Sequence, residues 1–390
     1  MSALFNLFYI YDPWLFHFFR MSIFVGLIFF LIIIYRIYKN KFSQKLIIPI
    51  DSIIAVLLLI VISAIPMLIH GTKDFSVIIM YCKSLILFLI GISFYNLFYI
   101  CQENRFITDL KIGITIQAII GLFALCGIPF VIEFALSTNV ILPRFYGSEQ
   151  EYRLYNITSS AFFQLSIFYL MLFHFLLAYN ERNNTIQPIF IFLLLFIGLI
   201  SGRSFLMLSI ISLTVYFKWR YIPALLLFLL LCLFFALNYA DNKYVAHALE
   251  PLINLIYGKG HISSSTDTLM QKHLFMPTIK QFLFGDGYYY SPQGGYYGST
   301  DSGFLRQILY GGITYVMICF SFTFYFIWRI SQNWFNGSWK FIISTLFILT
   351  ILNIKADTYA FPGIMMIFLM FLSLFGNKGK ILMFFNQRKR

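Results

Sequence analysis

Charged side chains are scarce in this chain. Only 11% of its 390 residues are Asp, Glu, Lys or Arg, whereas soluble domains carry about 25%. Together with 60% hydrophobic residues, this composition excludes an ordinary soluble globular protein and predicts an integral membrane protein. Acidic residues are fewer than basic residues, 15 against 28, which leaves a formal net charge of +13. In a membrane protein such an excess is typical of basic loops on one side, so we expect no nucleic-acid partner.

Cysteine pairs and metal-ligand patterns are also lacking. The five cysteines form no CxxC pair, so we expect neither disulfides nor a thiolate metal site. No DxD pair and no His, Cys and Asp cluster with ligand spacing occurs, so no divalent metal or other cofactor is implied. No basic region precedes the first apolar run and no small-residue cleavage site follows it, which predicts a retained first span rather than a signal peptide.

Long apolar runs define the expected spans. About 18 residues are needed to cross the hydrocarbon core, and nine runs suit a crossing: 14–35, 46–69, 75–100, 112–136, 159–179, 221–240, 303–328, 341–355 and 358–375. The stretch 187–217 is too long for one simple span, and Gly202 divides it into two short helices that meet at a Ser-Gly-Arg-Ser turn. The sequence thus predicts an all-α polytopic membrane protein with about 11 transmembrane helices, in a range of about 10–12.

The distribution of Lys and Arg favours this hairpin. With the hairpin, one side of the membrane holds more than half of the 28 basic residues, as cytoplasmic loops do. The expected organisation is a transmembrane bundle at 1–240 with a small outer loop at 137–158, a large outer loop subdomain at 241–302, C-terminal spans at 303–375 and a basic cytoplasmic tail at 376–390. Prolines and glycines in the large loop predict short helices joined by turns.

An arginine interrupts one of the most apolar stretches. Arg203 lies at the centre of "FIGLISGRSFLMLSI", where burying a guanidinium in hydrocarbon costs from about 3 to more than 10 kcal/mol. It either pairs with a carboxylate, reaches the headgroups or binds an anion. Arg144 and Arg153 in the first outer loop and Arg306 at the start of a span have the same outer location. Because guanidinium matches phosphate oxygens in a bidentate manner, these arginines suit a lipid-linked phosphate or pyrophosphate.

A run rich in tyrosine and glycine ends the large loop. "GDGYYYSPQGGYYGSTDSGF" contains Tyr288, Tyr289, Tyr290, Tyr296 and Tyr297. One interpretation is an interfacial aromatic belt. The other is a sugar-binding surface, since rigid rings on glycine turns suit stacking on sugar faces.

Three motifs follow one another along the chain: "LISGRSFLMLSI" (199–210), "FLFGDGYYY" (282–290) and "TDSGFLRQILYGGITY" (300–315). In this order they resemble the SRG or GSR segment, the P-L-F-G-x-G segment and the D-[NS]-G-[YF]-L stretch of O-antigen and capsular polysaccharide polymerases. Two departures are the displaced proline, at Pro277, and Gly-Arg-Ser in place of Ser-Arg-Gly. The related O-antigen ligases have a His where Asp301 stands here, which favours a polymerase, although His261 and His273 keep the ligase alternative open.

The resemblance implies a glycosyltransferase of the bacterial inner membrane, similar to the lipid-carrier-dependent, GT-C-like enzymes. Its site would face the periplasm and transfer a growing glycan from undecaprenyl pyrophosphate to the next lipid-linked repeat unit. The implied partners are these glycan substrates, membrane lipid and a chain-length regulator protein. Arg203 and Arg306 would hold the pyrophosphate, with Arg144 and Arg153 at the second carrier or the entry path.

A general base would activate the acceptor hydroxyl. Asp301 is the first candidate by position, and its alternative role is an N-cap of the helix beginning at Gly303. Further candidate bases are Glu149, Glu151 and His261, and His261 could also contact substrate. Asp286 suits a turn, His247, His261 and His273 suit ordinary loop roles, and Asp357 is a candidate partner for Lys355 or Arg203.

Two rival functions come from other classes. A lipid-linked oligosaccharide flippase would also bury arginines, but the chain has no internal repeat and its polar residues gather in the outer loops. A membrane-bound acyltransferase needs a His beside an acid or nucleophile, and His17, His70 and His174 near the spans lack such neighbours in the sequence. Both rivals are therefore less favoured than the polymerase.

Overall fold

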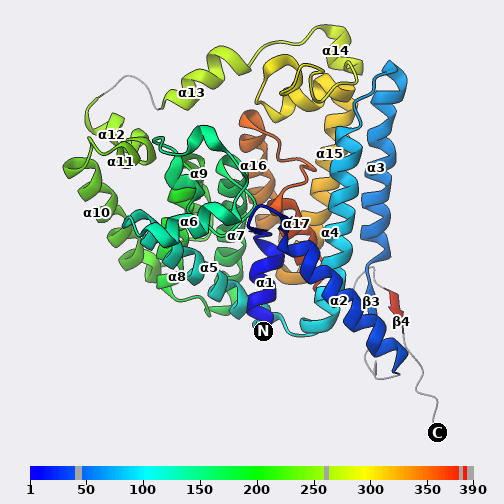
Figure 1. Cartoon of the computed structure of the whole chain (residues 1–390), viewed down its shortest axis with the longest axis horizontal. Coiled ribbons are helices and arrows are strands. Elements are labelled where there is room, and N and C mark those ends of the chain that lie inside the picture. The colour runs from blue at the N-terminus through cyan, green and yellow to red at the C-terminus, as the bar shows by residue number, and fades with distance from the viewer. Residues whose placement is uncertain (40–45, 259–262, 377–380, 384–390) are drawn as a thin grey trace. The chain divides into compact units, whose positions relative to one another are not determined.

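The computed structural model describes residues 1–39, 46–258, 263–376 and 381–383. The protein is mostly helical (Figure 1). Its long apolar helices are those of a membrane-embedded protein, as the sequence predicts. Within the described residues, six helices are long and apolar enough to cross a membrane. They are α3 (Ile50–His70), α4 (Ser76–Phe98), α5 (Glu103–Leu125), α7 (Phe162–Asn183), the segment Trp219–Asn238 that contains η3 (Trp219–Tyr221) and α10 (Ile222–Asn238), and α15 (Gly303–Phe335).

Shorter elements complete the chain. Two small antiparallel sheets pair β1 (Trp14–Leu15) with β2 (Phe19–Arg20) and β3 (Leu46–Ile48) with β4 (Ile381–Met383). The other helices outside the two polar loops are α1 (Ser2–Ile10), α2 (Met21–Tyr38), α6 (Pro129–Thr138), α8 (Pro188–Ser201), α9 (Arg203–Val215), α16 (Trp339–Lys355) and α17 (Ile364–Leu372).

In the part of the chain that the structure describes, the two polar loops at 137–158 and 241–302 contain short helices, which for the large loop is as predicted. The first holds η1 (Pro143–Phe145) and η2 (Glu151–Leu154). The second holds α11 (Lys243–Ala248), α12 (Glu250–Ile256), α13 (Ser264–Thr268), the π-helical turn η4 (Leu269–His273), α14 (Ile279–Phe284) and η5 (Tyr297–Ser299).

The chain divides into two compact units. Unit 1 contains 1–24, 104–267 and 363–365, and unit 2 contains 25–103, 268–362 and 366–390. The expected loop subdomain 241–302 therefore contributes to both units. In unit 1, α7 packs against α8 and α9, and its side chains from Leu165 to Asn180 are all buried. In unit 2, α15 packs against α3, α14 and α16 (Figure 1).

The predicted hairpin around Gly202 is present. Helix α8 ends at Ser201, α9 begins at Arg203, and Gly202 has φ 157° and ψ 156°. The end of the hairpin lies beside its beginning. After α9, Arg220 Nη2 donates to the Ile186 carbonyl at 2.5 Å and Lys218 Nζ to Asn184 Oδ1 at 2.6 Å, and both acceptors precede α8. One continuous helix over 187–217 would be about 45 Å long and would separate these groups.

Three predicted spans have the wrong boundaries. Residues 14–20 form the β1–β2 hairpin rather than helix, because the buried Asp12 pairs with Arg20 at 3.1 Å and accepts a hydrogen bond from Ser22 at 2.5 Å. The run 112–136 is split by a turn at Gly127, with φ +80°. The run 358–375 is helical only in α17, since Thr358 bonds to Asn353 and Pro362 follows.

Candidate functional site

Arg306 is the centre of a buried polar cluster in unit 2. It lies in the first turn of α15 with its side chain only 4% exposed. Nη1 donates to Oδ2 of Asp357 and Nη2 to Oδ1 of Asp301, both at 3.1 Å, while Nε donates to the Thr300 carbonyl at 3.1 Å. All three guanidinium nitrogens therefore have an oxygen partner, as a buried arginine requires.

Asp357 forms the inner side of this cluster. It follows α16 and is 1% exposed, and its Oδ2 also accepts a hydrogen bond from the Tyr289 hydroxyl. Burial raises the pKa of Asp357 to about 6, although Arg306 and the Tyr289 hydroxyl act in the opposite direction. The carboxylate is thus ionised at pH 7 and neutralises Arg306. The sequence had suggested Lys355 or Arg203 as its partner and had not considered Arg306.

Asp301 forms the outer side and does not cap α15, as Ser302 occupies the N-cap position. Its side chain is 54% exposed, and its Oδ2 lies 3.5 Å from His273 Nε2. His273 Nδ1 is 3.0 Å from the Ser299 carbonyl, and Thr300 Oγ1 donates to the His273 carbonyl at 2.6 Å. The carboxylate and the imidazole are therefore adjacent and reachable from solvent. We call Arg306, Asp357, Asp301, His273 and Tyr289 the Arg306 cluster.

The five predicted tyrosines pack largely on one another. Tyr290 and Tyr296 stack with ring centroids 5.2 Å apart, and Tyr288 lies 5.5 Å from Tyr297 at an interplanar angle of 30°. The Arg306 guanidinium lies 3.2 Å from the centroid of the Tyr296 ring. Tyr289 is buried and the other four are partly exposed. The tyrosine run is thus built into the Arg306 cluster.

Backbone contacts explain the glycines around this run. Gly312 has φ +73° inside α15, and a Cβ there would lie 2.2 Å from the Leu283 carbonyl oxygen. A Cβ on Gly285, which also has positive φ, would lie 2.7 Å from the Tyr310 carbonyl oxygen. Helix α15 is interrupted by non-helical backbone at Gly311 and Gly312. Glycine at positions 285 and 312 lets α14 and the following loop approach this break closely.

Two aspartates fix the loop further. Asp74 Oδ2 accepts from the amides of Tyr289 and Tyr290 at 2.7 and 2.8 Å. Asp286 Oδ2 accepts from Gln281 Nε2 at 2.8 Å and from the Tyr297 hydroxyl at 3.1 Å. Asp286 therefore has the structural role that the sequence favoured, and Asp74 is a support that the sequence did not reveal.

Arg203 has a carboxylate partner in unit 1. Its guanidinium pairs with Glu250, the first residue of α12, and the two side chains are 11% and 19% exposed. Pairing with a carboxylate is one of the alternatives that the sequence leaves open for Arg203, beside an anion site. Glu250 also accepts hydrogen bonds from the amide and hydroxyl of Ser264 at 3.0 and 3.3 Å. The salt bridge thus ties the hairpin turn to the large loop.

Arg153 lies close to the same turn. Its Nε donates to the Ser201 carbonyl at 3.1 Å, and its guanidinium lies 4.5 Å from the centroid of the Phe162 ring. Burial, and to a lesser degree Arg203, lower the pKa of Arg153 to about 10. Arg144 is exposed, with its guanidinium over Phe145. The three predicted site arginines in unit 1, Arg144, Arg153 and Arg203, therefore differ in environment, and Arg144 is the most accessible of the three.

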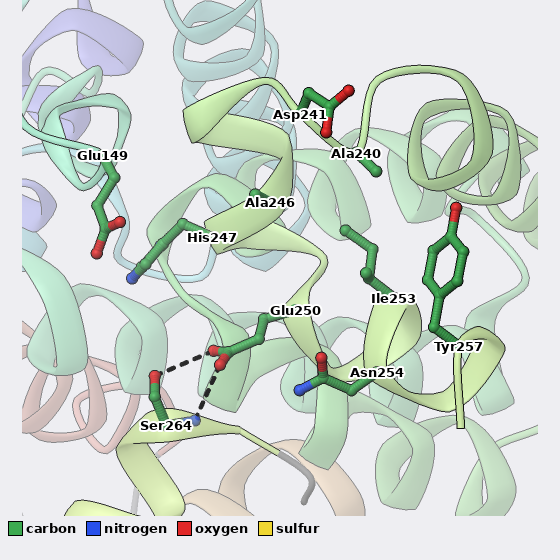
Figure 2. Close-up of a pocket in the computed structure, with 10 residues that line it drawn as sticks. All are labelled: Glu149, Ala240, Asp241, Ala246, His247, Glu250, Ile253, Asn254, Tyr257 and Ser264. Atoms are coloured by element: carbon green, nitrogen blue, oxygen red, sulfur yellow. Dashed lines mark hydrogen bonds between the residues drawn. The ribbon is translucent and has the colours of Figure 1, made fainter. Parts of the chain in front are cut away.

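A pocket of about 540 Å³ opens beside this region (Figure 2). We call it the loop pocket, and its polar lining consists of Glu149, Asp241, His247, Glu250, Asn254, Tyr257 and Ser264. His247 Nδ1 lies 2.9 Å from the Tyr152 hydroxyl. Burial, followed by Arg203 and Arg153, lowers the pKa of His247 to about 3, so the imidazole is neutral.

The remaining candidates have simpler positions. Glu151 accepts from the Tyr155 hydroxyl at 2.8 Å and from the Gly147 amide. His261 lies outside the described residues.

Among the described residues, no group of three or more His, Cys, Asp or Glu is placed to hold a metal ion. No motif or spacing singled out Glu250 or Asp74. Asp301 and His273 were both candidates, and the structure places them side by side.

No model of a protein family, no curated protein and no solved structure matches this chain. The polymerase resemblance therefore rests on the three motifs and on their order in the sequence.

Proposed function

We propose that this protein is a polysaccharide polymerase that joins undecaprenyl-pyrophosphate-linked repeat units by glycosyl transfer on the periplasmic face of a bacterial inner membrane. The observation that supports this most is the exposed Asp301 carboxylate, held between Arg306 and His273 at the start of a membrane helix. A base, a cation and a histidine at this position suit attack of a sugar hydroxyl on a lipid-linked donor.

The two aspartates that bond to Arg306 differ in how easily a substrate oxygen can replace them. Asp357 is buried and holds Nη1, whereas Asp301 is 54% exposed and holds Nη2. In the proposed reaction, a donor pyrophosphate oxygen replaces Asp301 on Nη2. Arg306 stays anchored by Asp357 and becomes a hydrogen-bond donor to the leaving group.

The released Asp301 carboxylate then serves as the base. It takes the proton of the acceptor hydroxyl while the acceptor oxygen forms a bond to C1 of the donor sugar. The bond between C1 and the pyrophosphate oxygen breaks, and its electron pair leaves with undecaprenyl pyrophosphate. Arg306 stabilises the charge that grows on this leaving group. His273, beside Asp301, can carry the proton onward to solvent.

The surroundings of the Arg306 cluster are compatible with a glycan. Tyr288 and Tyr297 are partly exposed at its edge and offer rings and hydroxyls to sugars. The remaining features of the proposal come from the sequence: about 11 spans, the GT-C-like resemblance and the outer location of both polar loops. A chain-length regulator and membrane lipid remain the proposed partners.

An O-antigen ligase is the second candidate. The observation in its favour is His273, which lies 3.5 Å from Asp301 and could take the role that the resemblance assigns to the ligase histidine. The two functions differ in the acceptor: a polymerase extends a lipid-linked repeat unit many times, whereas a ligase transfers a finished glycan once to another lipid.

The test uses full-length protein in detergent with a synthetic polyprenyl-pyrophosphate repeat unit and a gel that resolves products by length. Wild type should produce a ladder, and Asp301→Asn and Arg306→Lys should reduce its rate by at least about 100-fold, the lower range for loss of general-base catalysis. Lys280→Ala, an exposed basic residue on α14, is the matched control and should leave the rate unchanged.

The other outcomes assign the protein to a rival class. One transfer to a lipid A acceptor without a ladder would establish the ligase. Movement of the labelled lipid across liposomes without any new glycosidic bond would establish the flippase and exclude the chemistry proposed here.

A further inference from the structure

The loop pocket in unit 1 shares no residue with the Arg306 cluster. It lies between the first outer loop, which contributes Glu149, and α11 to α13 of the large loop (Figure 2). Its volume of about 540 Å³ is within the range of small-molecule sites. The proposed glycosyl transfer therefore leaves a sizeable polar pocket without a role.

His247 provides an open hydrogen-bonding atom in this pocket. Its side chain is buried, with only 9% of the residue exposed, and Nδ1 is occupied by Tyr152. Among the residues that the structure describes, Nε2 has no partner, and Figure 2 shows the ring reaching from α11 toward Glu149. Because the imidazole is neutral, Nε2 either donates or accepts, depending on the tautomer that Tyr152 selects.

The other polar groups restrict the chemistry of a ligand. Glu149, Asp241 and Glu250 are acceptors when ionised, so a ligand must bring donors. Glu250 is already neutralised by Arg203 and bonded to Ser264, as Figure 2 shows for the serine. An anion such as pyrophosphate would meet carboxylates without an unpaired cation in the lining. A hydroxyl group fits both requirements, since it donates to a carboxylate and can also match either tautomer of His247.

Apolar surface accompanies these groups. Tyr257 and Ile253 line the pocket on the side of α12. A sugar ring has hydroxyl donors around its edge and flat C–H faces that stack on aromatic side chains, so it matches both the polar and the apolar lining. The volume admits a segment longer than one monosaccharide.

We propose that the loop pocket binds the sugar residues of a lipid-linked glycan, with Glu149 and His247 Nε2 contacting sugar hydroxyls; this inference rests on the proposed function. The pocket recognises the glycan and takes no part in proton transfer or in leaving-group stabilisation. His247 and Glu149 are thus binding residues, and Arg203 is a positioning residue that holds Glu250.

The test measures binding separately from transfer. The probe is the free oligosaccharide released by mild acid from the lipid-linked glycan that accumulates in cells containing this protein. Its binding to the full chain in detergent is followed by calorimetry for wild type, His247→Gln and Glu149→Gln. Glu133→Gln, an exposed glutamate on α6 outside the pocket, is the matched control.

Each pocket variant should weaken oligosaccharide binding by about fivefold to tenfold, the effect of losing one hydrogen bond, with Glu133→Gln unchanged. In the ladder assay, both variants should raise KM for the repeat unit with little change in kcat, whereas Asp301→Asn should lose kcat and still bind the oligosaccharide.

Two results separate failure of this inference from failure of the proposed function. A ladder whose KM is unchanged in both pocket variants, or wild type that does not bind millimolar oligosaccharide, would overturn the pocket assignment and leave the polymerase intact. Binding that is lost in the variants, with no ladder from wild type, would overturn the polymerase and leave the glycan pocket in place.

Discussion

Nη1 of Arg306 lies 3.1 Å from Oδ2 of Asp357, and both side chains are almost fully buried. Replacing Asp357 leaves Nη1 of the buried guanidinium without its carboxylate partner, and breaking a buried ion pair costs about 3–5 kcal/mol. We therefore expect Asp357→Asn to lower the thermal unfolding midpoint in detergent strongly. Asp301→Asn, which breaks the exposed bond of the same guanidinium, should cost less than about 1 kcal/mol. Equal losses in the two variants would contradict the division into an anchoring and an exchangeable carboxylate.

Gly312→Ala should disrupt the packing of α14 on α15. The added Cβ would lie 2.2 Å from the Leu283 carbonyl oxygen at a φ of +73°, so a steric clash adds to backbone strain of about 1–3 kcal/mol. Gly71→Ala has a similar φ of +61°, but its Cβ would meet open space in the described structure, so only about 1–2 kcal/mol is expected. Limited proteolysis of the loop should accelerate in the first variant. Equal proteolysis rates would indicate that the clash is relieved by a small backbone shift.

Arg203 and Glu250 should show strong coupling in a double-mutant cycle. Arg203→Met leaves Glu250 without its cation in a largely buried position, and should destabilise the protein more than the double variant with Glu250→Gln does. The interaction energy should be about 1–3 kcal/mol. Thermal unfolding of the four proteins in detergent measures it. Additive effects would show that Arg203 is not held by Glu250, which would favour the anion site instead.

His247 should make stability depend on pH. In the unfolded chain a histidine binds a proton near pH 6.5, whereas burial keeps the pKa of folded His247 at about 3. Between these values the unfolded state binds more protons, so stability is lost as pH falls from about 6.5 toward 3. The groups around the ring are Arg203, Arg153, Tyr152 and Glu149. His247→Gln should reduce the difference between the unfolding midpoints at pH 7.5 and pH 5. An unchanged difference would assign the acid sensitivity to other groups.

The hairpin at Gly202 predicts the topology of the second half of the chain. In a background without native cysteines, Arg182→Cys and Trp219→Cys should both be protected from a membrane-impermeant thiol reagent in intact cells, and both should react after permeabilisation. Tyr146→Cys in the first outer loop should react without permeabilisation. All three positions are exposed. Opposite accessibility of positions 182 and 219 would contradict the hairpin.

Local signals in the sequence were sufficient for the hairpin and for the short helices of the large loop. Gly202 interrupts an apolar run, and the prolines of 241–302 limit helix length, so both features depend on nearby residues. The N-terminal span was misplaced because hydropathy does not report that Asp12 needs Arg20 as a partner. Apolar composition alone also could not show that Thr358 hydrogen-bonds to the Asn353 side chain and so lies outside a helix.

The candidate site was predictable in its residues but not in its pairings. Asp301 and Arg306 follow from a motif, and the structure adds that they bond to each other. Glu250 is far from Arg203 in the sequence, and several acidic residues could equally have served as its partner. His273 ends the π-helical turn η4 and lies 3.5 Å from Asp301, and Thr300, 27 positions after His273 in the sequence, donates to the His273 carbonyl. Such long-range choices depend on tertiary packing, which no short motif contains.

The break at Gly311 and Gly312 has a consequence for how the protein tolerates its lipid environment. Residues 313–335 of α15 are about 35 Å long at 1.5 Å per residue, which matches a bilayer core with modest tilt. Residues 303–310, which include Arg306, lie beyond the break. Residues 313–335 are thus long enough to cross the hydrocarbon core by themselves. Residues 303–310, and Arg306 with them, are not needed for the crossing, so the guanidinium does not have to lie within the hydrocarbon.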